Sequence, residues 1–186
     1  MRWFWIDRFE RFVSGVEATA IKNVTFAEEP LDDYLPGRPH YPHSLIIEGM
    51  AQTGGLLLSQ LEDFHSRIVL AKVSKAEFFC LVNPGDRLRL HASLQSVQPE
   101  GAIIQGQTHV DDQLQGQFEM TFAILNESYG DSSFFEPVGL MRMLRVLRLF
   151  EVAVDQQGQR VNIPQYMLDA EREEVAGYDL SPLGGD

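Results

Sequence analysis

Residues 34–63 of this 186-residue chain read YLPGRPHYPHSLIIEGMAQTGGLLLSQLED, and this stretch predicts the core of the fold. Its first part is a loop, because Pro36, Pro39 and Pro42 recur at every third residue and each disfavours helix in the residue before it. From Ser44 onward the sequence predicts a helix that is apolar almost all the way round, which is typical of a buried helix. We therefore expect this helix to lie inside the fold.

Small residues leave much of the predicted helix without side-chain bulk, at Gly49, Ala51, Gly54 and Gly55. A glycine inside a helix costs about 1 kcal/mol relative to alanine, so the close approach of another backbone should compensate. We expect a sheet wrapped closely around the helix to provide that approach.

The rest of the first two thirds of the chain is dominated by the period-two alternation of half-buried strands. Strands are expected over residues 2–13, 16–24, 67–79, 88–95, 104–110 and 114–124. A strong turn signal, NPGD at residues 83–86, separates two of them. An antiparallel sheet with one apolar face, covering one buried helix, is an α+β architecture.

Two parts of the chain differ in pattern. Residues 1–126 carry the strands and the central helix, whereas residues 127–186 form an extension with an amphipathic helix expected at about 138–150. The acidic tail beyond it should be loosely held, anchored only around residues 166–168.

Composition excludes several classes of function. The chain is 44% hydrophobic and 23% charged, and it lacks the run of roughly 20 apolar residues that a membrane span needs. A net charge of −12 argues against nonspecific nucleic-acid binding. The N-terminal residues carry no export signal pattern, so we expect a cytoplasmic location. The single cysteine excludes an intrachain disulfide and a multi-cysteine metal site.

The loop, the helix and the following turn together carry a family resemblance. Residues 36–39 (PGRP), Pro42, residues 45–52 (LIIEGMAQ) and residues 83–86 (NPGD) are similar to the β-hydroxyacyl-acyl carrier protein dehydratases of the hotdog fold. The resemblance covers about residues 1–126. It implies a sheet wrapped around a helix, a dimer, no cofactor, and a tunnel for an acyl chain at the dimer interface.

The resemblance also implies roles for individual residues. Glu48 corresponds to the acid that protonates the departing hydroxyl, and the backbone N–H of His43 to the amide that polarises the thioester carbonyl. The family histidine that removes the α-proton lies fourteen residues before the acid, where this chain has Tyr34. The resemblance further implies that Gly37, Pro42, Gln52 and Phe79 contact the substrate.

The tyrosine leaves the general base open, because a phenol is almost wholly protonated at neutral pH and is a poor base. His40 and His43 lie close by in sequence and could supply the imidazole, or they could be loop residues that bond to backbone or water. Tyr34 could act itself or only pack the loop. The pair of histidines lacks a third ligand, so no metal site is expected.

Glu48 is the one charge within the apolar run, and a charge in a core is costly unless it is paired or neutralised. It could be a structural acid satisfied by its neighbours or a functional one. Three functions remain open: a 3-hydroxyacyl-thioester dehydratase, a subunit that lends Glu48 to a histidine-bearing homologue in a heterodimer, and an acyl thioesterase.

The expected partners are an acyl carrier protein or a coenzyme A thioester, together with a second copy of the chain in a homodimer or an oligomer of dimers. Arg142, Arg145 and Arg148 form a stripe on the helix expected in the extension. They could dock an acidic carrier protein or could simply be the polar face of a surface helix.

Overall fold

The structure is a computed structural model that describes residues 4–28, 37, 39–125 and 136–177. Its strands form one sheet in the order β3-β6-β5-β4-β2-β1-β7. The strands are β1 (Arg8–Val13), β2 (Glu17–Asn23), β3 (Arg67–Phe78), β4 (Arg87–Gln98), β5 (Gly101–Val110), β6 (Gln113–Leu125) and β7 (Ala153–Val154). The helices are α2 (His43–Ser59), η1 (Gln60–Glu62), α3 (Pro137–Val146), α4 (Leu149–Val152) and α5 (Gln165–Gly177).

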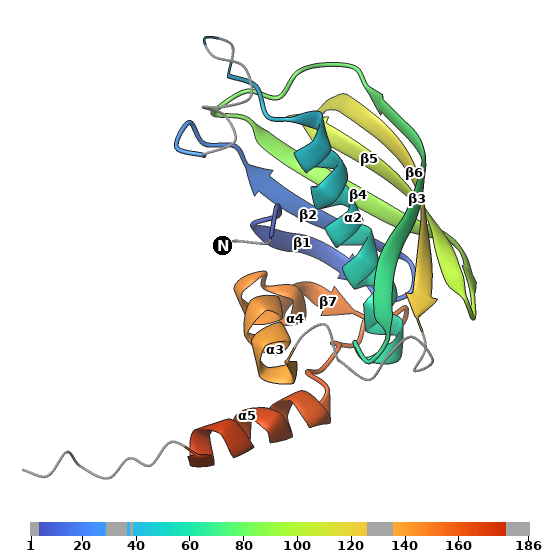
Figure 1. The fold of residues 1–186 in the computed structure, drawn as a ribbon, viewed down its shortest axis with the longest axis vertical. Coiled ribbons are helices and arrows are strands. Elements are labelled where there is room, and N and C mark those ends of the chain that lie inside the picture. The colour runs from blue at the N-terminus through green and yellow to red at the C-terminus, as the bar shows by residue number, and fades with distance from the viewer. Residues whose placement is uncertain (1–3, 29–36, 38, 126–135, 178–186) are drawn as a thin grey trace, which may run out of the picture.

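The sheet curves around α2, which lies along its concave face (Figure 1). All neighbouring strands pair antiparallel except β1 and β7, which are parallel. This confirms the predicted α+β architecture, an antiparallel sheet wrapped around a central helix. In the part of the chain that the structure describes, no helix is long and apolar enough to cross a membrane.

Close contact between α2 and the sheet depends on glycine. A Cβ at Gly54 would lie 2.9 Å from the Ile104 side chain on β5, and one at Gly49 would lie 3.0 Å from Leu90 on β4 and 3.2 Å from the backbone oxygen of Trp5. All three distances are tighter than ordinary packing allows. The mid-helix glycines therefore bring the helix axis close to the sheet, as the sequence predicts.

Helix α2 is buried against the sheet along one stripe, but the prediction that Glu48 lies in the core is wrong. One stripe of the helix packs on the sheet, and this stripe is made of Ile46, Gly49, Met50, Thr53, Gly54, Leu57 and Leu58. Glu48 lies outside that stripe and is exposed rather than enclosed in the core. Burial of an unpaired carboxylate is costly, and the fold avoids the cost by turning Glu48 away from the sheet.

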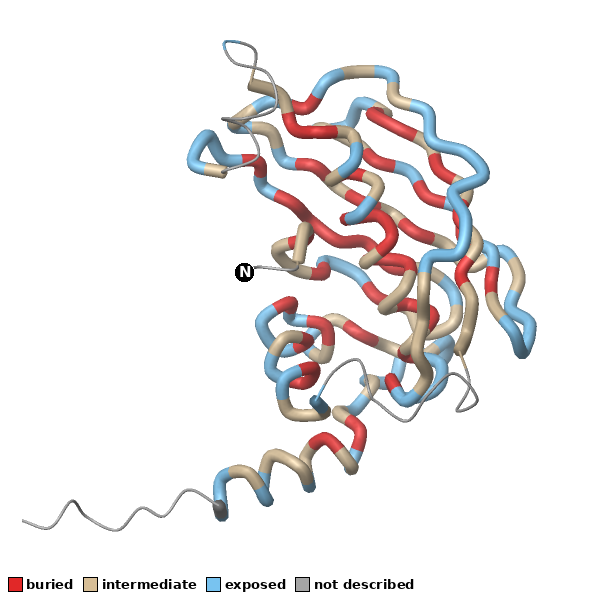
Figure 2. The backbone as a smooth tube through the Cα atoms, viewed as in Figure 1, coloured by how far each residue is buried: buried red, intermediate tan, exposed pale blue. Residues whose placement is uncertain are grey.

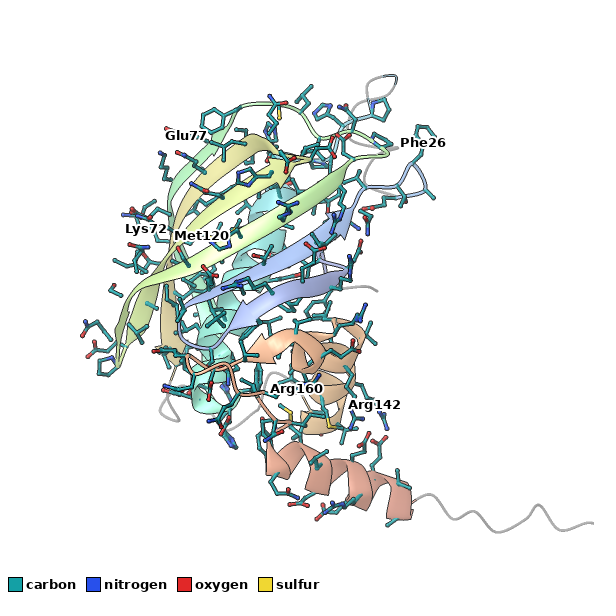
Figure 3. All side chains as sticks on the ribbon, turned by 180° about the vertical axis from the view of Figure 1, so that it is seen from behind. Phe26, Lys72, Glu77, Met120, Arg142 and Arg160 are labelled. Carbon is teal, nitrogen blue, oxygen red and sulfur yellow. The ribbon has the colours of Figure 1, made fainter. Side chains whose placement is uncertain are left out.

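The two edges of the sheet differ. Strand β3 is exposed along most of its length, as the pale blue run in Figure 2 shows, and its Lys72 projects from the edge in Figure 3. At the other edge, β7 pairs with β1 through Phe12 and Val13. One edge of the sheet is thus covered by the extension and the other is open.

The extension is more ordered in its packing than the sequence suggests. Where one helix is expected over residues 138–150, the structure has α3 and α4, separated at Arg148, whose φ of 59° interrupts the helix. Residues 165–177, expected to be loosely held, form α5. Met167 is fully buried and the Tyr166 hydroxyl donates to the Asp63 backbone oxygen at 3.1 Å, so the expected anchor is present.

Candidate functional site

An open groove of about 860 Å³ runs along the face of α2 that the sheet does not cover. Its volume is in the range of small-molecule sites in proteins. The stripe of α2 that lines it is made of Glu48, Ala51, Gln52, Gly55, Leu56 and Ser59, and this helical spacing places all six on one face. Ile68, Val69 and Leu70 of β3 line one side, and Phe4, Leu140 and Met143 also contribute to the lining.

Glu48 is the one acidic side chain among the described residues that line the groove. The Gln52 side-chain amide donates to Glu48 Oε1 at 3.0 Å. Gln52 is itself positioned, because the backbone N–H of Trp5 donates to Gln52 Oε1 at 2.8 Å. The chain of two bonds fixes which way the amide points and leaves the carboxylate facing the groove. Such a group can hold or deliver a proton at a bound ligand.

His43 is the first residue of α2 and follows Pro42, which is buried and accepts the first helical hydrogen bonds from Leu45 and Ile46. The imidazole stacks on Phe78 with ring centroids 3.9 Å apart and an angle of 3° between the planes. Its Nε2 atom is buried and has no hydrogen-bond partner among the described residues.

The environment of His43 favours the neutral imidazole. Burial lowers the pKa of His43 below its ordinary value, and the charge of nearby His40 lowers that pKa further. A neutral ring with an unoccupied nitrogen lone pair can accept a proton. The start of α2 also presents backbone N–H groups that have no partner within the helix, which favours a partial negative charge on a ligand there.

The remaining predicted site residues lie in different settings. Gly37 is exposed with φ of 80°, and His40 is half-buried in the loop that leads to Pro42. Phe79 is 54% exposed, and its backbone N–H donates to Gln115. Tyr34 lies outside the described residues. Of the predicted residues that the structure describes, Glu48 and Gln52 line the groove.

Sequence reasoning missed the aromatic and extension residues of the groove, Phe4, Phe64, Phe122, Leu140 and Met143. The alternation in β6 did place Phe122 on the apolar face, which is a usable signal. Leu140 and Met143 lie three residues apart on α3, and nothing local in the sequence indicates which neighbour they face. Among the described residues, no group of three potential metal ligands occurs.

A curved antiparallel sheet around one long helix, with a ligand-sized groove on the outer stripe of that helix, defines a hotdog-fold protein. Solved structures agree with this class. A Streptococcus mutans protein crystallised with acetyl coenzyme A matches with a TM-score of 0.54 and 16% identity, over 68% of this chain and 94% of that one. A hypothetical thioesterase from Streptococcus pneumoniae, crystallised with coenzyme A, matches with a TM-score of 0.55 and 10% identity, over 67% of this chain and 89% of that one.

The family within this class is shown by sequence, since residues 4–118 match the FabA-like domain. The chain therefore belongs to the family of FabA-like domains. The 3-hydroxyacyl-[acyl-carrier-protein] dehydratase FabZ of Campylobacter hominis is 34% identical over 126 residues, 66% of this chain and 87% of the relative. The enzyme of the same name from Ligilactobacillus salivarius is 35% identical over 120 residues, 64% of this chain and 86% of the relative.

Proposed function

We propose that this protein binds acyl thioesters in the groove and eliminates water from 3-hydroxyacyl thioesters. The observation that carries the proposal is the carboxylate of Glu48, which is held by Gln52 and is the one acid among the described residues that line the groove. In the reaction a base removes the α-proton, the C–O bond to the hydroxyl breaks, and Glu48 donates the proton with which the hydroxyl leaves as water. The product is an enoyl thioester. The names of the relatives from Campylobacter and Ligilactobacillus support this reaction class.

We assign the general base to His43, ahead of His40 and Tyr34. Burial lowers the pKa of His43, which favours the neutral imidazole, and the Nε2 atom is without a partner among the described residues. The N–H groups at the start of α2 lie beside it and can stabilise the enolate oxygen that forms. The acyl group is carried by coenzyme A or by an acyl carrier protein.

The geometry of α2 supports an active site shared between two copies of the chain. Positions 43 and 48 are five residues apart, which places them about 7.5 Å apart along the axis and roughly 140° apart around it. Side chains that point so differently do not converge on one small substrate from the same helix. A homodimer would bring Glu48 of one chain toward His43 of the other.

The exposed edge of β3 is the surface that supports such a dimer. A long edge strand offers unpaired N–H and C=O groups and pairs readily with another chain. Leu70 and Val73 are exposed on this strand, and the groove lies directly beside it. A second copy paired along β3 would extend the sheet and cover the groove, turning it into a tunnel.

The test is the reverse reaction, hydration of a crotonyl thioester, followed by loss of the enoyl absorbance. Glu48→Gln should lower kcat by about 10²- to 10⁴-fold, the usual contribution of a general acid. Glu173→Gln, which neutralises an exposed carboxylate on α5, is the matched control and should leave the rate unchanged. Equal rates for the wild type and Glu48→Gln would refute the assignment.

The base is tested by comparing His43→Gln, His40→Gln and Tyr34→Phe in the same assay. His43→Gln should cause the largest fall in kcat. If either of the other two variants loses more activity than His43→Gln, the base belongs there instead. Activity that appears only when a histidine-bearing homologue is added would assign the chain to a heterodimer.

An exposed Glu48 could also activate water against the thioester carbonyl, which is the thioesterase reaction. The two reactions differ in product, because hydrolysis releases a free thiol and hydration does not. A thiol reagent added to the same assay separates them, and Glu48→Gln should abolish whichever signal is present.

A further inference from the structure

We infer that α3 of the C-terminal extension is the end wall of the acyl groove and sets the longest acyl chain that the protein accepts. The inference rests on the proposed function, since it takes an acyl thioester as the ligand. It assigns a role in specificity to Met143 and Leu140, which lie outside the residues that match the FabA-like domain.

The groove follows α2 from Glu48 to Ser59. Glu48 and Gln52 lie toward the start of α2, whereas Ser59 lies about 16 Å further along the helix axis. Between them the helix presents Ala51 and Gly55, which leave room for a ligand beside the backbone. A thioester headed by its reacting carbons at Glu48 would therefore direct its alkyl tail toward the end of α2.

The lining around this end of the groove mixes the polar residues Ser59, His65, Ser66 and Arg67 with apolar side chains that come from separate parts of the chain. Among the apolar ones, Phe64 follows η1, and Leu140 and Met143 belong to α3. Leu140 and Met143 are three residues apart and share one face of the helix. Their apolar surface favours an alkyl tail.

The wall is held in place from several directions and is not a mobile lid. Met141 and Leu144 of α3 are fully buried, and the backbone N–H of Phe9 on β1 donates to the Leu147 oxygen at 2.8 Å. On the outer side, Arg142 points toward α5 and donates two hydrogen bonds to Glu174 (Figure 3). A fixed wall measures chain length, because a tail that is too long must displace packed side chains.

The expected size of the effect follows from the transfer of methylene groups. Each CH₂ buried contributes a factor of about four in affinity, and each CH₂ that meets a packed wall forfeits at least that factor. Shortening a wall residue should therefore raise affinity for longer chains by about tenfold, and enlarging it should lower affinity for them by a similar factor.

The experiment measures binding independently of turnover. Thioether analogues of acyl coenzyme A with four, eight and twelve acyl carbons are titrated calorimetrically into the full-length protein. The variants are Met143→Ala, Met143→Trp and the control Val146→Ala, whose side chain lies on α3 but is 69% exposed. Met143 is only partly buried, so the two test variants should fold, which a thermal melt verifies.

We expect Met143→Ala to raise the affinity for the longest analogue relative to the shorter ones, Met143→Trp to lower it, and Val146→Ala to leave the profile unchanged. Identical chain-length profiles for all four proteins would overturn the inference, even if hydration of crotonyl thioester is intact. A wild type whose affinity does not depend on chain length, as when a second copy fills the groove, would overturn it too. If no thioester is turned over but the chain-length profile still changes in the Met143 variants, the role of α3 is supported and the proposed reaction is refuted.

Discussion

Helix α2 has two stripes of side chains that differ in composition, although both belong to the same apolar segment of the sequence. The inner stripe, which faces the sheet, contains no charged residue and has glycine where the backbones come closest. The outer stripe has small and apolar residues too, but also Glu48 and Gln52. Both stripes have the same helical spacing, so periodicity alone does not tell them apart.

The difference shows which constraints act on each stripe. The inner stripe is limited by shape, because packed interiors tolerate neither voids nor excess volume. Under the proposed function, the outer stripe is limited by chemistry, because the reaction needs an accessible and oriented carboxylate at Glu48. Changes on the inner stripe should therefore lower the free energy of unfolding, whereas changes on the outer stripe should lower activity and leave the fold intact.

Met50→Ala should give the largest effect, on stability. Met50 is fully buried, and its sulfur occupies the space opposite Gly106, where a Cβ would lie 2.5 Å away. The loss of its side chain should lower the free energy of unfolding by about 2–5 kcal/mol. Leu56→Ala on the outer stripe is the matched control and should cost about 1 kcal/mol, because Leu56 is half-buried. Urea denaturation compares the two, and equal losses would mean that the stripes do not differ.

Gln52→Glu should have the second largest effect, and it should lower activity. The new carboxylate can still accept the hydrogen bond from the Trp5 N–H but cannot donate to Glu48, and it places a second negative charge beside it. The lost hydrogen bond to a charged group predicts a fall in kcat/KM of about ten- to hundredfold with little change in Tm. The comparison variant Gln52→Leu also strands the Trp5 N–H and should lower Tm as well. Unchanged kcat/KM in Gln52→Glu would show that Gln52 does not orient the acid.

A feature of the fold or of the candidate site can be predicted from the sequence when neighbouring residues in the chain determine it. The alternation of strands, the turn at residues 83–86 and the glycines of α2 give the architecture, because each reflects the local backbone. The motif around Glu48 predicts two residues, Glu48 and Gln52, that the structure places in the lining of the groove. The exposure of Glu48 is not predicted, since an apolar run does not reveal which of its stripes meets the sheet.

In the extension, the sequence prediction misses contacts between residues far apart in the chain to a greater degree. Its arginines look like a free basic stripe in the sequence, but Arg142 and Arg145 donate to Glu174 and Glu171 of α5, and Arg148 to Glu151. The two pairings with α5 join residues 32 and 26 positions apart, and no periodicity of the sequence encodes them. The pairings weaken the interpretation of a carrier-protein docking stripe and favour a structural role.

The free energy of unfolding should also depend on pH through His43, and this effect should be smaller than those of Met50→Ala and Gln52→Glu. The folded protein lowers the pKa of His43, so the neutral form is favoured by folding. The associated stability is fully present above the ordinary histidine pKa of about 6.5 and is lost as pH falls through the lower pKa of the folded state. We expect the free energy of unfolding to decrease over this interval. His43→Phe keeps a ring against Phe78 without the titration and should flatten that part of the pH profile. An unchanged profile in His43→Phe would contradict the assignment.

Arg145→Ala should have the smallest effect on stability. It tests whether the ion pair on the outer side of α3 contributes as little as other exposed ion pairs do. The Arg145 guanidinium donates to both carboxylate oxygens of Glu171, at 2.6 and 3.1 Å, and this hydrogen bonding holds the pKa of Glu171 below its usual range. The pair is exposed, so its contribution is small and is screened by salt. Because the folded pKa is lowered, that contribution is present above the ordinary glutamate pKa and is lost as pH falls through the folded value. Thermal melts should therefore show a slightly lower Tm for Arg145→Ala at neutral pH and low salt, and no difference from wild type in strong acid. A difference that persists in acid would mean that Arg145 supports α3 through the packing of its alkyl chain and not through its charge.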